Sequence, residues 1–299
     1  MNIQQIKKVG VLGMGLMGSG IAQVIAEAGY QTIFRDVDQK ILDKGYGAIE
    51  SNLAKAVSKS KITPEFKEKT LKNLRGTTRL EDLADCDFIM EAVPEIIELK
   101  KQMFKELDKI CKPETVFASN TSSFSITEMA ASVSRSEKFV GLHFFSPVPM
   151  MKLVEVIKSV VISEETFRLA FDFAKSIGKT PVVAKDVPGF IVNAIVTVYL
   201  VEAVRYLENG FASIEDIDQA MKLGCGYPMG PFALFDLAGI DVMYRGINSL
   251  YEITKDNRYF PPSLLKKMVN AGYLGRKTGK GFYDYSTDPA KPNNFITLG

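Results

Sequence analysis

Hydrophobic and polar positions follow two different rhythms along the chain. As far as about Lys185, short β-branched runs alternate with amphipathic stretches, which is typical of βαβ units on a parallel sheet. Strands are predicted at Val9–Leu12, Thr32–Phe34, Phe88–Glu91, Val116–Ala118, Val140–Phe144, Leu153–Ile157 and Pro181–Ala184. Helices are predicted at Gly20–Ala28, Leu99–Ile110 and Glu164–Ile177, with a lysine-rich helix pair over Gln39–Leu74 that breaks near Thr63 and Pro64.

After the stretch KDVPGF (Lys185–Phe190) the strand pattern ends and helical periodicity takes over. Helices are predicted at Ile191–Leu207, Ser213–Leu223, Ile240–Thr254 and Pro262–Asn270. We therefore expect an α/β domain with a mostly parallel sheet at residues 1–187, followed by an all-helical domain at residues 188–299.

A glycine-rich turn lies between the first predicted strand and the next helix. Its sequence, VGVLGMGLMGSG, spaces Gly13, Gly15 and Gly18 as GxGxxG. In a dinucleotide-binding turn the first glycine permits the tight turn, the second lets a pyrophosphate approach the backbone, and the third allows close helix packing. The flanking strand and helix favour this interpretation, so these glycines, together with Leu16 and Met17, are candidate cofactor contacts.

An acidic residue, Asp36, ends the second predicted strand, 18 residues after Gly18. A carboxylate at this place binds the adenosine ribose hydroxyls, so NAD is the expected cofactor. The neighbouring Arg35 could instead pair with the 2′-phosphate of NADP, although Asp36 would repel that phosphate. The alternative role for Asp36 is a helix N-cap.

The only histidine, His143, lies in the apolar segment VGLHFF, and Glu155 lies in the equally apolar LVEVI. The turn-rich SPVPMM between them predicts a chain reversal that brings the two segments together. A buried carboxylate beside an imidazole fixes its tautomer and stabilises its protonated form, which makes a general base for a hydroxyl proton. The alternative is a core histidine with satisfied hydrogen bonds.

Composition narrows the range of partners. Among 299 residues, Lys+Arg 37 and Asp+Glu 35 give a net charge of +2, which disfavours nucleic acid or an anionic membrane surface as a partner. Three cysteines, Cys86, Cys111 and Cys225, form no CxxC, so neither disulfides nor a metal site is indicated and reduced thiols in a cytoplasm are expected. Polar residues interrupt the apolar stretch Phe190–Val204, which is too short to span a membrane, and the N-terminus shows no export signal.

Five motifs, in order, resemble those of the short-chain L-3-hydroxyacyl-CoA dehydrogenases: the glycine turn, ASNTSS, GLHFF.PVP..KLVEV, KDVPGFIVN and PMGPF.L.D..G.D. The resemblance covers nearly the whole chain. It implies a Rossmann-like NAD-binding domain and a helical substrate-binding domain that mediates homodimerisation. It also implies an NAD-dependent oxidoreductase that interconverts (S)-3-hydroxyacyl-CoA and 3-ketoacyl-CoA, with 3-hydroxybutyryl-CoA and acetoacetyl-CoA as the expected pair, in fatty-acid or butyrate metabolism.

The resemblance assigns roles to individual residues of the candidate catalytic site. His143 would take the 3-hydroxyl proton, with Glu155 as its orienting partner. Ser122 would hydrogen-bond the substrate oxygen, and its alternative is a loop cap. Asn193, which opens the first helix of the second domain, would reach the substrate from the other side of a cleft.

Cofactor and substrate contacts follow from the same resemblance. Glu95 and Lys100 would lie near the cofactor ribose and nicotinamide; otherwise they are a helix N-terminal acid and a solvated lysine. Lys55 and Lys59, four apart on a helix, would anchor the phosphates of coenzyme A, unless they belong to a solvated helix face. Where the family usually reads HFFNP this chain reads HFFSP, so Ser146 stands at a position expected to contact the cofactor.

Two other functions stay open at the level of the sequence. One is a related dehydrogenase that acts on a free hydroxy acid, against which Lys55 and Lys59 argue weakly. The other is a non-catalytic NAD-binding sensor, which would have no need of the paired histidine. Near the C-terminus, GRKTGKGFYDY could form an anion-binding nest, but a surface turn is the favoured interpretation.

Overall fold

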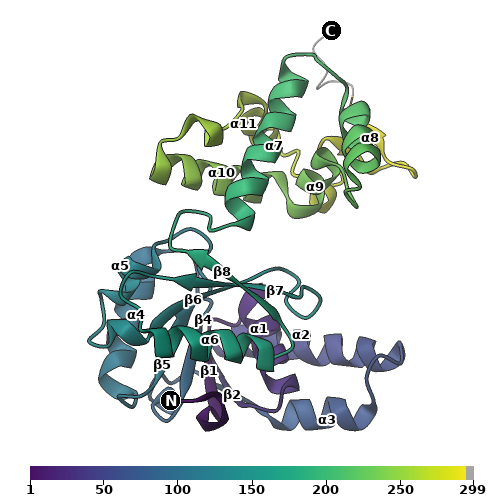
Figure 1. Ribbon diagram of the computed structural model, residues 1–299. Helices are drawn as coiled ribbons and strands as arrows, with labels where there is room; N and C mark the ends of the chain where they lie inside the picture. The colour runs from purple at the N-terminus through teal and green to yellow at the C-terminus, as the bar shows by residue number, and fades with distance from the viewer. Residues whose placement is uncertain (294–299) are drawn as a thin grey trace. The chain divides into compact units, whose positions relative to one another are not determined.

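The computed structural model describes residues 1–293 and divides into two compact units, Met1–Phe190 and Ile191–Gly299. In Figure 1 the first unit is a sheet flanked by helices, and the second consists mainly of helices. Within the described residues, no helix combines the length and the apolar character that a membrane crossing requires.

The first unit is built on one eight-stranded sheet in the order β3-β2-β1-β4-β5-β6-β7-β8. Neighbouring strands are parallel except for β6 and β7. The strands are β1 (Lys8–Leu12), β2 (Gln31–Arg35), β3 (Leu74–Thr77), β4 (Phe88–Glu91), β5 (Val116–Ser119), β6 (Phe139–Phe144), β7 (Leu153–Lys158) and β8 (Thr180–Lys185).

The sequence pattern missed one strand, β3. The predicted helix pair extended to Leu74, whereas the second helix ends at Lys72 and β3 begins at Leu74. This edge strand reads LRGT and has two exposed positions, so it lacks the apolar run by which the other strands were recognised. All seven strands predicted from the sequence are present.

Helices cover both faces of this sheet. They are α1 (Leu16–Glu27), α2 (Gln39–Ser58), α3 (Pro64–Lys72), α4 (Ile97–Ile110), α5 (Ile126–Ala130) and α6 (Glu164–Ser176). Alternate residues of β5 point to opposite faces: Val116 and Ala118 join the core that includes α1 and α6, whereas the Phe117 ring lies 5.7 Å from that of Phe104 in α4. The inner strands β4 and β5 are therefore buried on both sides, as is usual in parallel sheets, whereas the edge strands β3 and β8 have exposed positions.

The second unit contains α7 (Val192–Glu208), α8 (Ile214–Cys225), α9 (Pro231–Ala238), α10 (Ile240–Thr254) and α11 (Ser263–Asn270). The expectation that it is wholly helical was wrong in one detail, because β9 (Tyr283–Asp284) and β10 (Lys291–Pro292) form a short antiparallel pair. Two-residue strands are too short to show an alternating pattern in the sequence.

A buried carboxylate, Asp236 of α9, holds the stretch GRKTGKGFYDY in place. It accepts hydrogen bonds from the N–H groups of Phe282 and Tyr283, at 2.9 and 2.8 Å. A Cβ atom at Gly281 would lie 1.9 Å from the Asp236 side chain, so only glycine fits there. Burial raises the pKa of Asp236 to about 6 in spite of these donors. The glycine at position 281 thus serves this docking contact.

Candidate active site

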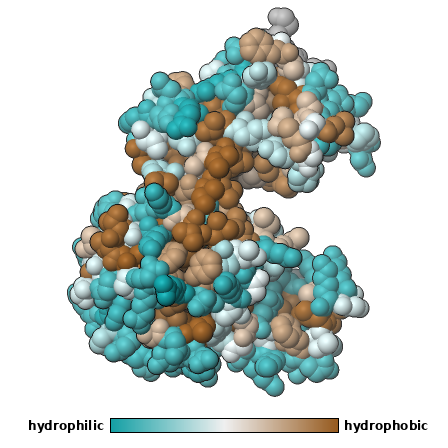
Figure 2. Space-filling view, viewed as in Figure 1, coloured by the Kyte–Doolittle hydropathy of each residue, from teal (hydrophilic) through white to brown (hydrophobic). Residues whose placement is uncertain are grey.

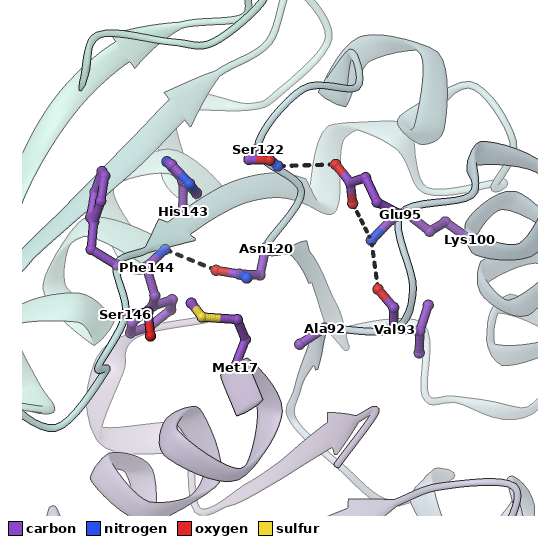
Figure 3. Close-up of a pocket in the computed structure, with 11 residues that line it drawn as sticks. Met17, Ala92, Val93, Glu95, Lys100, Asn120, Ser122, His143, Phe144 and Ser146 are labelled. Carbon is purple, nitrogen blue, oxygen red and sulfur yellow. Dashed lines mark hydrogen bonds and ion pairs between the residues drawn. The ribbon is translucent and has the colours of Figure 1, made fainter. Parts of the chain in front are cut away.

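The strand order places a pocket where ligands of open α/β sheets are expected. From β1 the chain moves outward to β2 and β3 and then returns to β4 on the other side of β1. Ligands bind outside the carboxyl ends of the strands at such a reversal. A pocket of about 340 Å³ lies there, lined by Met17, Ala92, Val93, Glu95, Lys100, Asn120, Ser122, His143, Phe144, Phe145 and Ser146. These residues come from β6 and from segments that follow β1, β4, β5 and β6 (Figure 3).

The glycine turn after β1 has the shape of a pyrophosphate cradle. Gly13 has a φ of 85°, and a Cβ atom there would lie 2.6 Å from the carbonyl oxygen of Ala92. A Cβ atom at Gly18 would lie 1.6 Å from the carbonyl oxygen of Gly13, whereas one at Gly15 would meet nothing within 4 Å. Gly15 caps α1 without a side chain, so the helix N-terminus offers backbone N–H donors beside open space. The turn fits a dinucleotide.

Asp36 lies just beyond β2 and is fixed against the glycine turn. Its carboxylate accepts a hydrogen bond of 2.8 Å from the N–H of Met14. The N-cap of α2 is Asp38, so the alternative role for Asp36 as a helix cap was wrong. Arg35 donates instead to the carbonyl of Thr78, at 3.3 Å. A carboxylate held in this way keeps acceptor capacity for ribose hydroxyls.

His143 and Glu155 face each other across the antiparallel pair β6–β7. They are direct partners in the register, and Nδ1 of His143 lies 2.7 Å from Oε2 of Glu155. Glu155 is 0% exposed and His143 is 5% exposed. When Glu155 is ionised its carboxylate only accepts, so Nδ1 then carries the hydrogen and Nε2 is the ring nitrogen left to exchange a proton in the pocket. The reversal expected from SPVPMM is present.

Lys100 is buried beneath the pocket and is not the solvated lysine that the sequence left as an alternative. It is 1% exposed, and its Nζ lies 2.6 Å from Glu91 and 3.1 Å from Glu95. Burial tends to raise the pKa of Glu95, but Lys100 and the hydroxyls of Thr121 and Ser123 outweigh it and hold the pKa below its ordinary value. Glu95 is therefore a fixed anion at the pocket wall.

The loop after β5 contributes two residues to the pocket, as Figure 3 shows. Ser122 lines it and donates its backbone N–H to Glu95, at 3.1 Å. Asn120 accepts a hydrogen bond of 2.8 Å from the N–H of Phe144, which ties the end of β5 to the end of β6. The sequence prediction did not name Asn120; its place directly after a buried strand, in ASNTSS, was the available signal. Ser146 lies in the same lining.

Other predicted site residues lie outside this pocket. Lys55 and Lys59 are exposed at the C-terminal end of α2, as a solvated helix face would be. Asn193 is partly buried in the first turn of α7, in the second unit. Their roles stay predictions.

A dinucleotide cradle whose pocket also holds a carboxylate-paired histidine defines an NAD-dependent oxidoreductase. Comparison with known families makes the class more specific. Residues 8–187 match the model described as 3-hydroxyacyl-CoA dehydrogenase, NAD binding domain, and residues 189–285 match that of the C-terminal domain. The chain therefore belongs to the 3-hydroxyacyl-CoA dehydrogenase family, and its cofactor is NAD.

Similar proteins of known name agree with this membership. The chain is 48% identical over 279 residues to 3-hydroxybutyryl-CoA dehydrogenase of Clostridioides difficile, covering 93% of this chain and 99% of the relative. It is 46% identical to the mitochondrial hydroxyacyl-coenzyme A dehydrogenase of Homo sapiens, covering 94% and 91%. The crystal structure of (S)-3-hydroxybutyryl-CoA dehydrogenase from Ralstonia eutropha superposes with a TM-score of 0.90 at 42% identity, covering 95% and 100%. The expected family, fold class, enzyme class and cofactor are thus confirmed.

Proposed function

We propose that this enzyme interconverts (S)-3-hydroxyacyl-CoA and 3-ketoacyl-CoA, with 3-hydroxybutyryl-CoA and acetoacetyl-CoA as its pair. The observation that carries the proposal is the His143–Glu155 pair, whose histidine lines the pocket beside the dinucleotide cradle. The names of relatives that match along almost their whole length support the choice of substrate.

His143 is the base of the proposed reaction. In the oxidising direction its Nε2 accepts the proton of the 3-hydroxyl group, while Nδ1–H keeps its hydrogen bond to Glu155. The ionised Glu155 then stabilises the imidazolium that forms, and it needs no movement because its carboxylate is already in place. When bound, NAD supplies the hydride acceptor. Ser122 donates a hydrogen bond to the substrate oxygen as its C–O bond becomes a carbonyl.

In the proposed reaction the cofactor is bound by groups whose positions are already fixed by hydrogen bonds and ion pairs within the fold. Asp36 accepts the adenosine ribose hydroxyls, and the amides at the start of α1, around Leu16 and Met17, receive the pyrophosphate. Glu95, oriented by Lys100, accepts from the nicotinamide ribose. Ser146 lies beside the nicotinamide.

The remaining assignments concern substrate and assembly. Lys55 and Lys59 attract the phosphates of coenzyme A, and Asn193 contacts the substrate. Residues 1–187 act as the cofactor domain and 188–299 as the substrate and dimerisation domain.

A homodimer is supported by an apolar groove of about 510 Å³ in the second unit, lined by Ile191, Val192, Ile195, Val196, Tyr199, Tyr227, Pro228, Met229 and Leu234. Hydrophobic side chains gather over the start of α7 in Figure 2. A cytoplasmic location stays a prediction.

The test is NADH oxidation with acetoacetyl-CoA, followed by absorbance. We expect turnover by the wild type and a loss of about 100- to 10,000-fold in His143→Ala, the range for general acid-base catalysis. NADH binding should change little, because the glycine turn and Asp36 hold the cofactor without the histidine. Cys225→Ser, at an exposed position in α8, is a matched control and should keep full activity.

Three outcomes contradict the proposal in different ways. If the activity of His143→Ala stays within about threefold of wild type, the His143–Glu155 pair has a structural and not a catalytic role. Turnover of free 3-keto acids but not of the CoA ester would show that the enzyme is a dehydrogenase of free hydroxy acids. If the folded protein binds NADH but turns over neither substrate, the non-catalytic NAD-binding sensor becomes the favoured function.

A further inference from the structure

The turn before α7 holds a bulky residue in an unfavourable backbone conformation. Phe190 has a φ of 49°, in the left-handed region that aromatic residues rarely adopt. Among residues 1–293 only Ser60 and Lys255 share this feature without being glycine. Those two lie just past the ends of α2 and α10, where a left-handed residue commonly terminates a helix. Phe190 follows no helix, so helix termination does not explain it.

In this conformation the ring of Phe190 contacts His143, the proposed base. The centroid of its ring lies 5.6 Å from that of the His143 imidazole, and the two planes are tilted by 56°. Phe145 makes a second contact with the imidazole, at 4.5 Å and the same tilt. With Glu155 holding Nδ1, three side chains restrict the imidazole. Rotation about the last torsion of a histidine is otherwise broad.

The segment that carries Phe190 is anchored within the first unit. Asp186 accepts hydrogen bonds from Ser125 Oγ at 2.9 Å and from the N–H groups of Ile126 and Thr127 at 2.9 and 2.7 Å. These donors form the N-terminus of α5, directly after the loop that carries Ser122. Asp186 therefore fixes one end of the segment.

The turn itself is closed by a second bond. The N–H of Phe190 donates to the carbonyl of Val187, at 3.0 Å, and Gly189 has a φ of 76°. The backbone that carries the Phe190 ring is thus fixed by the bonds of Asp186 to the start of α5 and by the turn bond between Phe190 and Val187. A strained residue persists only where its surroundings hold it, and such residues cluster at functional sites.

We propose that Phe190 is a positioning residue, whose strained backbone is retained because it presses the ring against His143 and holds Nε2 in line with the substrate hydroxyl. The inference rests on the proposed role of His143 as the base. Phe190 itself exchanges no proton. Its removal leaves the His143–Glu155 bond possible but lets the imidazole tilt, so proton transfer slows while cofactor binding is kept.

The experiment compares Phe190→Gly, Phe190→Leu and Phe190→Tyr with wild type. Glycine relieves the backbone strain and deletes the ring, leucine keeps an apolar side chain without a ring, and tyrosine keeps the ring. Lys255→Gly is the matched control, because it relieves a similar φ of 53° in the second unit. Measurements are kcat, KM for NADH and for acetoacetyl-CoA, the pH–rate profile, the solvent isotope effect on kcat, and thermal unfolding.

We expect kcat to fall by about 10- to 100-fold in Phe190→Gly, the effect of misplacing a catalytic group by about 1 Å. KM for NADH should stay within about threefold, the solvent isotope effect should rise and the pH–rate profile should shift, because proton transfer becomes limiting. Phe190→Leu should show the same changes to a smaller degree. Phe190→Tyr and Lys255→Gly should stay within about threefold of wild type.

Several results overturn the inference. One is a folded Phe190→Gly with kcat, pH–rate profile and isotope effect like those of wild type. Another is a higher KM for acetoacetyl-CoA with an unchanged pH–rate profile and isotope effect. That result would mean that Phe190 acts on substrate binding through the residues that follow it and does not orient His143. If Phe190→Gly does not fold, Phe190→Leu decides by the same criteria. An active His143→Ala would instead refute the proposed function, whatever Phe190 does.

Discussion

Replacing Lys100 by methionine tests the buried charges beneath the pocket. The change removes the ammonium that lies 2.6 Å from Glu91, whose side chain is 0% exposed. Glu91 keeps hydrogen bonds from Ser119 Oγ at 2.5 Å and from the N–H of Val93 at 2.7 Å, but it has lost its counter-charge. Removing one partner of a buried ion pair costs about 3–5 kcal/mol. At about 2–4 °C per kcal/mol for a unit of this size, Tm should fall by about 6–20 °C.

A second substitution isolates the charge from the packing. Glu91→Gln in the Lys100→Met background removes the uncompensated carboxylate and should restore most of the lost stability. Thermal unfolding of wild type, Lys100→Met and the double variant by circular dichroism at neutral pH measures both steps. A Tm of Lys100→Met within about 2 °C of wild type would refute the reasoning, and so would a double variant less stable than the single one.

The pH dependence of the same variants gives a further check. Burial raises the pKa of Glu95, but the attraction of Lys100 and the hydrogen bonds from Lys100, Thr121 and Ser123 together outweigh it, so the pKa in the folded protein lies below its ordinary value of 4.5. A lowered pKa adds stability that is present above the unfolded value and disappears as the pH falls through the folded value. The Tm difference between wild type and Lys100→Met should therefore narrow below pH 4.5. A constant difference would exclude Glu95 from the coupling.

Three further predictions concern the catalytic and cofactor contacts. Glu155→Gln should lower kcat and move the pH–rate profile to lower pH, because the imidazolium of His143 loses its counter-charge; an unmoved profile contradicts the pairing. Wild type should use NADH with clearly higher kcat/KM than NADPH, since Asp36 repels a 2′-phosphate, and equal efficiencies would mean that Arg35 faces the ribose. Ser146→Asn should change kcat/KM by no more than about tenfold, or ~1.4 kcal/mol, because one hydrogen bond is at stake; an inert wild type that Ser146→Asn activates would favour the sensor.

The parts of the fold that the sequence predicted are those with strong local signals. Seven strands were recognisable because each is an apolar, β-branched run bounded by polar segments. The edge strand β3 escaped because two of its four residues are exposed, and an edge strand needs less apolar surface. The pair β9–β10 escaped because its docking depends on Asp236, about 46 residues earlier in the chain.

For the site, the sequence by itself determined the chemical groups: the glycine turn, Asp36, and a histidine and a glutamate on two apolar strands joined by a turn. Residue type and spacing suffice there, because a GxGxxG turn and a strand reversal are local features. Only the tertiary structure decided that Lys100 is a buried counter-ion, that Asn120 belongs to the pocket, and that the Phe190 ring contacts the base. These facts depend on which carboxylates, strand ends and rings meet across the sheet, and contacts between residues distant in sequence leave no periodic or compositional trace along the chain.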